Sequence, residues 1–270
     1  MVEVPKAEHK ESPSETPPII IKIGGNTLLE ETTIIGGIAT LHGNGRPLIV
    51  VHGGGHTIDY KLRKRKIDPK KIDGVRVTDK PTLEVVIGAL AEINKQLVEK
   101  LLALGVNAFG LTGKEIRLLK ADMENPKLGF VGRVRKVNRA FLKDKIGQGF
   151  VPVISPVAYT IINGSIQLLN VNSDLVAGRI ASAFPGSQLL LLTDVEGVKD
   201  QNGNIIQELD MAQYGNMAVK RVIRDGMIPK IDAAFDALSH RSVPRIISGK
   251  KPHAMLDALG GKSIGTSFID

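Results

Sequence analysis

The hydrophobic positions along the chain fall into two kinds of pattern. Short β-branched runs at 18–23 and 47–51 are almost free of polar residues, as is typical of buried strands, and Lys22 is the exception. Over residues 82–104, by contrast, apolar residues recur every three or four positions, which predicts a long amphipathic helix. Strands that alternate with helices in this way predict an α/β fold with a mostly parallel sheet covered on both faces.

The same patterns predict the other elements. Further strands are expected at 108–111, 130–137, 150–154, 159–168, 189–192, 244–247 and 265–268, and further helices at 27–42, 56–65, 174–184, 211–224, 231–240 and 252–258. In the 82–104 helix, Thr82 is the expected N-cap and Gly105 the stop. Asn94 falls on its apolar face, so we expect this side chain to be buried and hydrogen-bonded. The Asn163-Gly164 pair is typical of a tight hairpin turn.

Composition narrows the class of protein. The chain has 270 residues, 42% of them hydrophobic, which suits one large domain or two lobes. The proline-rich residues 1–17 predict an unstructured tail before a folded unit at 18–270. No apolar run is long enough for a signal peptide or a membrane span, and cysteine is absent. We therefore expect a cytoplasmic protein with no membrane partner.

The formal charge of +8 suits nucleic acid, an acidic surface or small anionic substrates. Basic residues concentrate between Lys61 and Lys71, where only Tyr60 is near enough to stack on a base. We interpret this basic segment as a solvated face and expect no nucleic-acid partner. A nucleic-acid-binding protein stays the alternative from another class, and it predicts salt-sensitive binding to DNA or RNA.

Two glycine turns end the two most apolar strands, Gly24-Gly25 after the first and Gly53-Gly54-Gly55 after the second. Such turns let a backbone approach a ligand and present N–H groups to it, and ligands bind at the carboxyl edge of open α/β sheets. Lys22 precedes the first turn, and a lysine in a buried strand is costly unless an anion meets it. The turns match neither a Walker A loop nor a dinucleotide fingerprint, so an anion site of another kind is predicted.

Two further cations are candidates for anion binding. Arg76 stands between β-branched residues, where its planar fork could hold a carboxylate or phosphate, although an ion pair with Asp73 or Asp79 explains it equally well. Lys230 follows a glycine turn at the start of a predicted helix, where a positive charge opposes the helix dipole. A phosphate held nearby would explain that position, and so would a solvated lysine.

Polar residues precede the predicted helix at 174–184. Asn170 and Asn172 alternate toward the same side, and either Ser173 or Asp174 could cap the helix. In a binding site, the asparagine would hold a polar substrate and the aspartate would orient nearby cations. No general base, zinc-ligand spacing or catalytic triad stands out, and His52 is interpreted as a structural hydrogen-bonding residue. Cations and glycine N–H groups without a base favour phosphoryl transfer, which needs positioning and charge neutralisation.

Taken together and in order, these motifs resemble the amino acid kinase family. The matching segments are Ile21–Asn26, Val51–Gly55, Gly74–Asp79, Asn94-Lys95, Asn170–Asp174, Leu192–Val198, Gly226–Lys230 and Pro252–Ala254. The resemblance implies a three-layer α/β/α sandwich with a mostly parallel central sheet. It also implies a substrate lobe at about 18–168 and an ATP lobe at about 169–270.

The resemblance also implies roles for individual residues. The catalytic positions would be Lys22, Lys230, Asp174, Gly25 and Gly54, and the substrate-binding positions would be Gly54, Gly55, Arg76 and Asn170. The nucleotide-binding positions would be Asp194, Val195, Glu196, Gly197, Val198, Lys199, Val222, Ile223 and Arg224. ATP would be used with Mg²⁺ held mainly by its phosphates, so no metal site made of protein ligands is expected.

Within the family, the motifs are most similar to the branch that phosphorylates the γ-carboxylate of N-acetyl-L-glutamate in arginine biosynthesis. The alternative is a sibling kinase that acts on glutamate or aminoadipate linked to a carrier protein, which the basic segment would suit. Ser173 stands where the family usually has alanine. The tail does not resemble the N-terminal helix of arginine-inhibited hexamers, and Asp257 and Ser263 align with their arginine-binding positions. We therefore expect an arginine-insensitive homodimer.

Overall fold

The computed structural model describes residues 16–24, 31–72 and 74–270. Its strands are β1 Ile19–Ile23, β2 Leu48–His52, β3 Lys71–Ile72, β4 Val75–Arg76, β5 Ala108–Thr112, β6 Leu119–Met123, β7 Gly132–Val137, β8 Val151–Ser155, β9 Val157–Ile162, β10 Ser165–Asn170, β11 Gln188–Thr193, β12 Glu208–Leu209, β13 Val243–Ser248 and β14 Thr266–Phe268. Its α-helices are α1 Glu31–Gly43, α2 Gly55–Lys64, α3 Lys80–Ala103, α4 Arg139–Gly147, α5 Ser173–Ser182, α6 Met211–Val219, α7 Ile228–Leu238 and α8 Ala254–Leu259.

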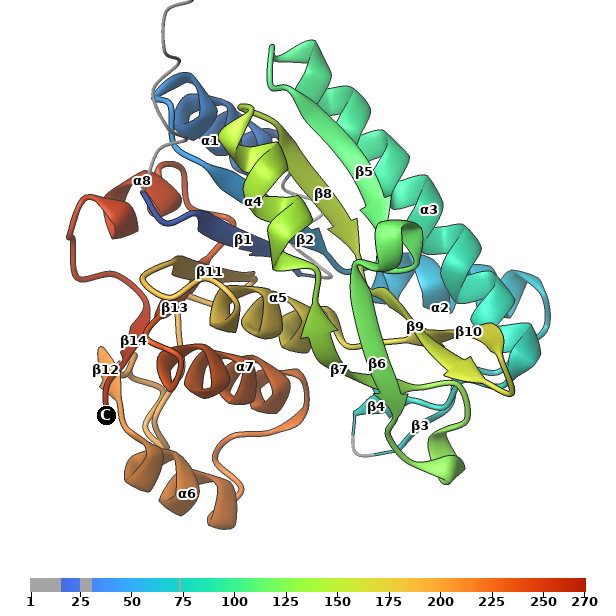
Figure 1. Ribbon diagram of the computed structural model, residues 1–270. Coiled ribbons are helices and arrows are strands. Elements are labelled where there is room, and N and C mark those ends of the chain that lie inside the picture. The colour runs from blue at the N-terminus through green and yellow to red at the C-terminus, as the bar shows by residue number, and fades with distance from the viewer. Residues whose placement is uncertain (1–15, 25–30, 73) are drawn as a thin grey trace, which may run out of the picture.

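The main sheet has eight strands in the order β12-β14-β13-β11-β1-β2-β8-β5 (Figure 1). Neighbouring strands are parallel except β13 and β14, which are antiparallel. A second sheet of order β10-β9-β6-β7 and the small β3-β4 hairpin lie beside it. Because β1 and β2 are central and parallel, their carboxyl ends meet at one edge, where Gly24 follows β1 and Gly53 follows β2.

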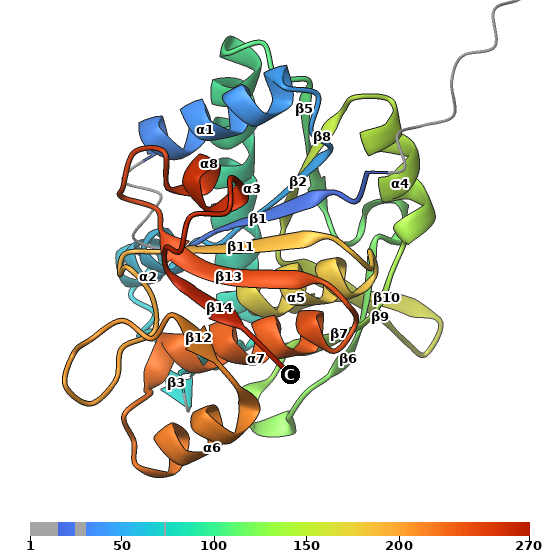
Figure 2. The ribbon, with the colours of Figure 1, turned by 90° about the vertical axis from the view of Figure 1, so that its left-hand side faces the viewer.

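Helices cover both faces of the main sheet, and Figure 2 shows α1 and α8 above it and α5 and α7 below. The alternation of β1 explains this arrangement, because successive side chains of a strand point to opposite faces. Ile19, Ile21 and Ile23 belong to the core beneath α1, α3 and α8. Ile20 belongs to the core shared with α5 and α7, and Lys22 has the same parity. The predicted three-layer α/β/α sandwich is confirmed.

The predicted start of the long helix is wrong by two residues. The helix α3 begins at Lys80, and Asp79 caps it by accepting a hydrogen bond of 2.9 Å from the Thr82 N–H. The proline at position 81 fits the first turn, where a missing N–H has no intrahelical partner to lose. The stop at Gly105 is confirmed, since its φ of +76° is the left-handed conformation that ends helices.

The other predictions differ from the structure mainly at their ends. The Asn163-Gly164 turn joins β9 to β10, with φ of +50° and +77°, as a tight hairpin requires. The helix predicted at 211–224 ends at Val219. The strand β6 and the helix α4 were not predicted, because their short apolar patterns are interrupted by lysines and arginines.

Candidate active site

One buried carboxylate holds two lysines together at the carboxyl edge of the sheet. The Lys22 Nζ lies 2.8 Å from Asp174 Oδ1, and the Lys230 Nζ lies 3.3 Å from Asp174 Oδ2. Only 3% of the Lys22 side chain, 6% of Asp174 and 13% of Lys230 are exposed. Three residues separated by up to 208 positions in the chain therefore form one cluster with a net charge of +1, which is suited to an anion.

Burial sets the protonation behaviour of this cluster. Desolvation lowers the pKa of Lys22 from 10.5 to about 8, although the Asp174 carboxylate opposes the shift. Burial also pushes the pKa of Asp174 upward, but Lys22 and Lys230 outweigh it and hold that pKa below its ordinary value of 3.8. At neutral pH Asp174 is therefore ionised and Lys22 is largely protonated.

Asp174 and Lys230 each lie in the first turn of a helix, α5 and α7 respectively. The N-cap of α5 is Asn172, whose Oδ1 accepts from the Asp174 N–H at 2.8 Å, so neither Ser173 nor Asp174 caps this helix as predicted. Asp174 instead lies in the first turn, where the helix dipole favours a carboxylate. Lys230 lies in the first turn of α7 and also donates to the Gly226 carbonyl at 3.2 Å. The Asp174 carboxylate thus compensates for the unfavourable position of the Lys230 charge at the start of α7.

The spacing of α5 and α7 depends on Gly178. A Cβ on this residue would come within 2.6 Å of the Ala233 carbonyl oxygen and 2.9 Å of the Ala233 Cβ. No role was predicted for Gly178. The signal was present, because a glycine inside a helical pattern weakens the helix and usually has a packing reason.

The second glycine turn, Gly53-Gly54-Gly55, leads into α2 at the carboxyl edge of the sheet. The Gly53 N–H is used by the sheet, because it donates to the Ile23 carbonyl at 2.9 Å. Gly54 is the N-cap of α2 without a side-chain cap, and a Cβ there would meet Ile93 at 2.8 Å. An uncapped helix start leaves backbone N–H groups available to an anion, and binding of an anion at Gly54 and Gly55 stays a prediction. Gly25, also predicted, lies outside the described residues.

Arg76 is buried and pairs with a residue that was not predicted. Its Nη2 lies 2.5 Å from Asp59 Oδ1 of α2, and only 8% of its side chain is exposed. The Nη1 atom of Arg76 is buried without a hydrogen-bond partner. Of the two partners considered from sequence, Asp79 caps α3 and Asp73 lies outside the described residues. An inward donor without a partner is costly, which indicates that a ligand oxygen meets it.

Hydrogen bonds connect Asn170 with Arg76 through Thr78. The Asn170 Nδ2 donates to Thr78 Oγ1 at 3.1 Å, and that hydroxyl donates to the Arg76 carbonyl at 2.9 Å. Two predicted substrate residues, one at the end of β10 and the other on β4, are therefore parts of one connected structure. Thr78 is fully buried and was not singled out from sequence, because a threonine beside a short strand carries no distinctive signal.

The predicted nucleotide segments follow two different elements. Residues 194–199 come directly after β11, where the Val198 N–H donates to Thr266 Oγ1 at 2.8 Å. Glu196 forms an exposed ion pair of 2.6 Å with Lys251. Residues 222–224 follow α6, where Ile223 is buried and the Arg224 Nε donates to the Arg221 carbonyl at 2.6 Å. Val222 lines a hollow of about 240 Å³ together with residues 200–202, so the second predicted segment lies beside the turn that follows the first.

His52 has the structural role that was predicted. Its Nδ1 bonds the Gly53 carbonyl at 2.9 Å, and its Nε2 lies 3.0 Å from Ser155 Oγ and 3.1 Å from Asn94 Nδ2. Asn94 also donates to the Val153 carbonyl at 2.9 Å, so its expected burial and hydrogen bonding are confirmed. Burial lowers the pKa of His52 to about 4, so the ring is neutral near pH 7.

Metal ligands are not grouped in the described part of the chain, where no set of three or more His, Cys, Asp or Glu side chains is placed to hold an ion. The same part contains no helix long and apolar enough to cross a membrane. What the site offers is positive charge on buried side chains, an uncapped helix start and a buried arginine. These groups suit an anionic substrate and the charge that develops when a phosphoryl group is transferred.

Comparison with known proteins identifies the family of this chain. The sequence signature of the amino acid kinase family matches residues 17–248. An acetylglutamate kinase of Dehalococcoides mccartyi is 35% identical over 253 residues, which are 92% of this chain and 93% of that protein. One of Archaeoglobus fulgidus is 38% identical over 268 residues, at 92% and 91% coverage. The crystal structure of smu.665 from Streptococcus mutans has a TM-score of 0.80 and 28% identity, covering 93% of this chain and 97% of that one. This chain therefore belongs to the amino acid kinase family.

Proposed function

We propose that this protein is an acetylglutamate kinase, which transfers the γ-phosphoryl group of ATP to the γ-carboxylate of N-acetyl-L-glutamate in arginine biosynthesis. The observation that carries the proposal is the buried cluster in which Asp174 holds Lys22 at 2.8 Å and Lys230 at 3.3 Å. Similarity to acetylglutamate kinases over most of the chain supports this acceptor. The products are an acyl phosphate and ADP.

The cluster supplies charge where the reaction needs it. A carboxylate is already a nucleophile at neutral pH, so the absence of a general base among the described site residues agrees with this chemistry. In phosphoryl transfer, negative charge spreads over the oxygens of the transferred group and over the leaving oxygen. Lys22 and Lys230 neutralise that charge, and Asp174 keeps both ammonium groups in position before the substrates arrive. Gly54, the N-cap of α2, contributes its own backbone N–H.

The acceptor binds mainly in the part of the chain before about residue 169, with Asn170 contributed from just beyond that boundary. Arg76 has a buried Nη1 without a partner, and a carboxylate oxygen of acetylglutamate provides one. Asn170 and Gly55 complete the acceptor site. ATP binds over the part that follows, where residues 194–199 and 222–224 hold the nucleotide. We therefore divide residues 18–270 into a substrate lobe to about 168 and an ATP lobe from about 169.

Mg²⁺ fits this site as an ion carried by the phosphates of ATP. The carboxylate of the cluster, Asp174, is paired with both lysines and is not free to coordinate a metal. When bound, Mg²⁺ neutralises charge on the polyphosphate. The protein residues act on the remaining charge of the transferred group.

One assay tests the proposed function. ATP consumption is measured with N-acetyl-L-glutamate, free glutamate, aspartate and UMP in turn, and hydroxylamine traps any acyl phosphate as a hydroxamate. Turnover and hydroxamate are expected with acetylglutamate, and both should be lost in Lys230→Ala. The sibling kinase that uses a carrier-linked substrate predicts no turnover of free acetylglutamate.

We further propose an arginine-insensitive homodimer. Asp257 and Ser263, which align with arginine-binding positions, are used within the chain. Asp257 pairs with Lys262 at 2.7 Å, and Ser263 donates to Gln207 at 3.0 Å. Light scattering should give the mass of a dimer, also after residues 1–17 are deleted, and millimolar arginine should not inhibit the parent. A hexamer that falls to a dimer on truncation contradicts the proposal.

A further inference from the structure

A basic hollow lies at the edge of the sheet opposite the lysine cluster. It has a volume of about 510 Å³ and is lined at the amino ends of β1, β2 and β8 by residues such as Pro18, Leu48 and Val151. Helix α4 and the loop after α1 form its sides. A hollow of this size is large enough for a small organic molecule.

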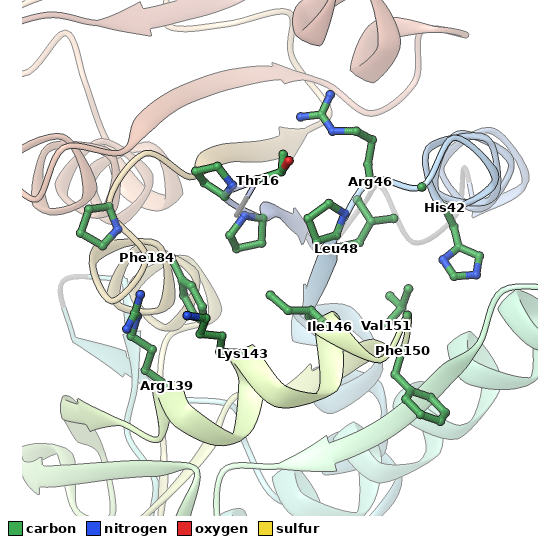
Figure 3. Close-up of a pocket in the computed structure, with 17 residues that line it drawn as sticks. Thr16, His42, Arg46, Leu48, Arg139, Lys143, Ile146, Phe150, Val151 and Phe184 are labelled. Atoms are coloured by element: carbon green, nitrogen blue, oxygen red, sulfur yellow. The ribbon is translucent and has the colours of Figure 1, made fainter. Parts of the chain in front are cut away.

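The charged side chains that face this hollow are all positive. They are Arg46, Arg139 and Lys143; His42 also lines the hollow, and no Asp or Glu is among the described residues that do so. Figure 3 shows Arg139 and Lys143 projecting from α4 beside Phe184, and Arg46 across the hollow from them, on the loop after α1. His42 is occupied, because its Nε2 accepts from the Asn107 N–H at 3.4 Å. Three cations therefore remain for a ligand.

These three cations have little to bind within the described part of the chain. No ion pair there involves Arg46, Arg139 or Lys143, and the Nε of Arg46 is buried without a hydrogen-bond partner. The Arg139 guanidinium lies over the Phe184 ring, 5.2 Å from its centroid. Stacking on an aromatic face leaves the N–H groups at the edge of the guanidinium free to donate. Like charges that share a hollow repel one another, so an anion is the ligand that removes both penalties.

From this geometry we propose a second binding site, for a small organic anion with two or more negative charges, at the amino edge of the sheet. The carboxylate or phosphate groups of the ligand bind Arg46, Arg139 and Lys143. Its carbon skeleton lies against Pro17, Ile146 and Pro185, apolar lining residues that are exposed or half-buried and that an inorganic ion would leave uncovered. The site is separate from the lysine cluster, because Lys22 lies at the carboxyl end of β1 and Pro18 precedes its first residue.

Calorimetry on the full chain tests this site with two anionic probes, tricarballylate and glycerol 3-phosphate, and with glycerol as the neutral control. The chain offers a charge-matched pair of variants on α4. Lys143→Gln removes a positive charge that faces the hollow, whereas Lys145→Gln removes one that instead pairs with Asp144 at 3.1 Å. Lys230→Ala tests whether the probe occupies the lysine cluster instead. Thermal melts confirm that each variant is folded.

We expect at least one probe to bind with a millimolar or lower Kd, more weakly as salt is added, and glycerol not to bind. Arg46→Gln should weaken binding by about tenfold or more, because it removes a partly buried charge-assisted bond. Lys143→Gln should weaken it by about two- to fivefold, as for an exposed ion pair. Lys145→Gln and Lys230→Ala should leave the Kd unchanged. The probe that binds more tightly identifies the charged group of the natural ligand.

Three results would overturn the site. One is the absence of binding for both probes at millimolar concentration. Another is an equal loss with Lys145→Gln and Lys143→Gln, which would mean that the probe responds only to the general positive charge of the chain. The third is loss of binding in Lys230→Ala, which would place the probe in the lysine cluster.

Discussion

Gly178 of α5 and Ala233 of α7 lie so close that a Cβ on the glycine would come within 2.6 Å of the Ala233 carbonyl oxygen. Asp174 and Lys230 lie about one turn earlier on the same two helices, and their side chains meet at 3.3 Å. A backbone contact between two helices thus sets the distance between the ionic groups of the site. A methyl group added at position 178, about one helical turn from the charged groups, should therefore change the distance between Asp174 and Lys230.

Gly178→Ala should lower both stability and activity. The added Cβ meets backbone and cannot be relieved by turning a side chain, so the helices must separate. Overpacking of this kind costs about 1–3 kcal/mol, which outweighs the gain in helix propensity of about 1 kcal/mol. Urea unfolding measures the loss of stability, and the kcat measures the effect of moving Lys230 away from Asp174.

Gly88→Ala is the matched control for that substitution. Gly88 lies in the middle of α3 with open space around the position of a Cβ. The alanine should therefore raise stability by about 0.5–1 kcal/mol and leave kcat unchanged. Equal effects of the two substitutions would show that helix propensity, and not the contact with Ala233, determines the result at position 178.

Loss of either lysine should reduce kcat far more than it affects folding. Lys230→Ala and Lys22→Met each remove one preorganised positive group, which typically costs about 10²–10³ in rate. Asp174 keeps one lysine partner in each variant, so it is not left unpaired in the core. Thermal melts identify variants that remain folded at the assay temperature. Parent-like kcat in a folded variant would remove that lysine from the mechanism.

As Lys22 loses its proton with rising pH, activity should fall, whereas the contribution of Lys22 to stability should rise. Burial lowers its folded pKa to about 8 from 10.5, so kcat/KM, which reports the free enzyme, should fall as the pH rises through about 8. Between these two pKa values the unfolded chain binds more protons than the folded one, so the contribution of Lys22 to stability rises with pH. Rate profiles and urea unfolding from neutral to alkaline pH measure both trends. In Lys22→Met the rise in stability should be absent.

Residues that interrupt a local hydrophobic pattern could be predicted from sequence as buried polar groups. Lys22 interrupts a β-branched run before two glycines, and Asn94 interrupts the apolar face of a helix, so each indicated a buried polar group. Asp59 could not be predicted as the partner of Arg76, because that contact joins α2 to a separate hairpin. The cap of α5 was misassigned because Asn172, Ser173 and Asp174 are all good capping residues, and the backbone conformation at Asn172 decides between them.

His52 should make the protein less stable in mild acid. Its folded pKa of about 4 lies below the ordinary 6.5, so the unfolded chain takes up a proton between these values and the folded chain does not. Stability should therefore fall as the pH drops through this range, by about 3 kcal/mol at most for one group. Urea unfolding compares the parent with His52→Gln and with His240→Gln, which changes an exposed histidine. The acid slope should flatten only in His52→Gln, and an unchanged slope there would assign it to other groups.

Arg76→Lys should raise the KM for acetylglutamate and leave the KM for ATP nearly unchanged. The guanidinium can pair with Asp59 through Nη2 while the buried Nη1 binds a substrate carboxylate, whereas an ammonium group cannot reproduce this fork. Loss of a charge-assisted hydrogen bond is worth roughly 1.5–3 kcal/mol, or about ten- to hundredfold in KM. Arg63→Lys, an exposed change on the neighbouring α2, is the control and should alter neither constant. If Arg76 served only to pair with Asp59, Arg76→Lys would instead lower the free energy of unfolding with normal kinetics, so steady-state kinetics with each substrate varied and urea unfolding together decide between the two roles.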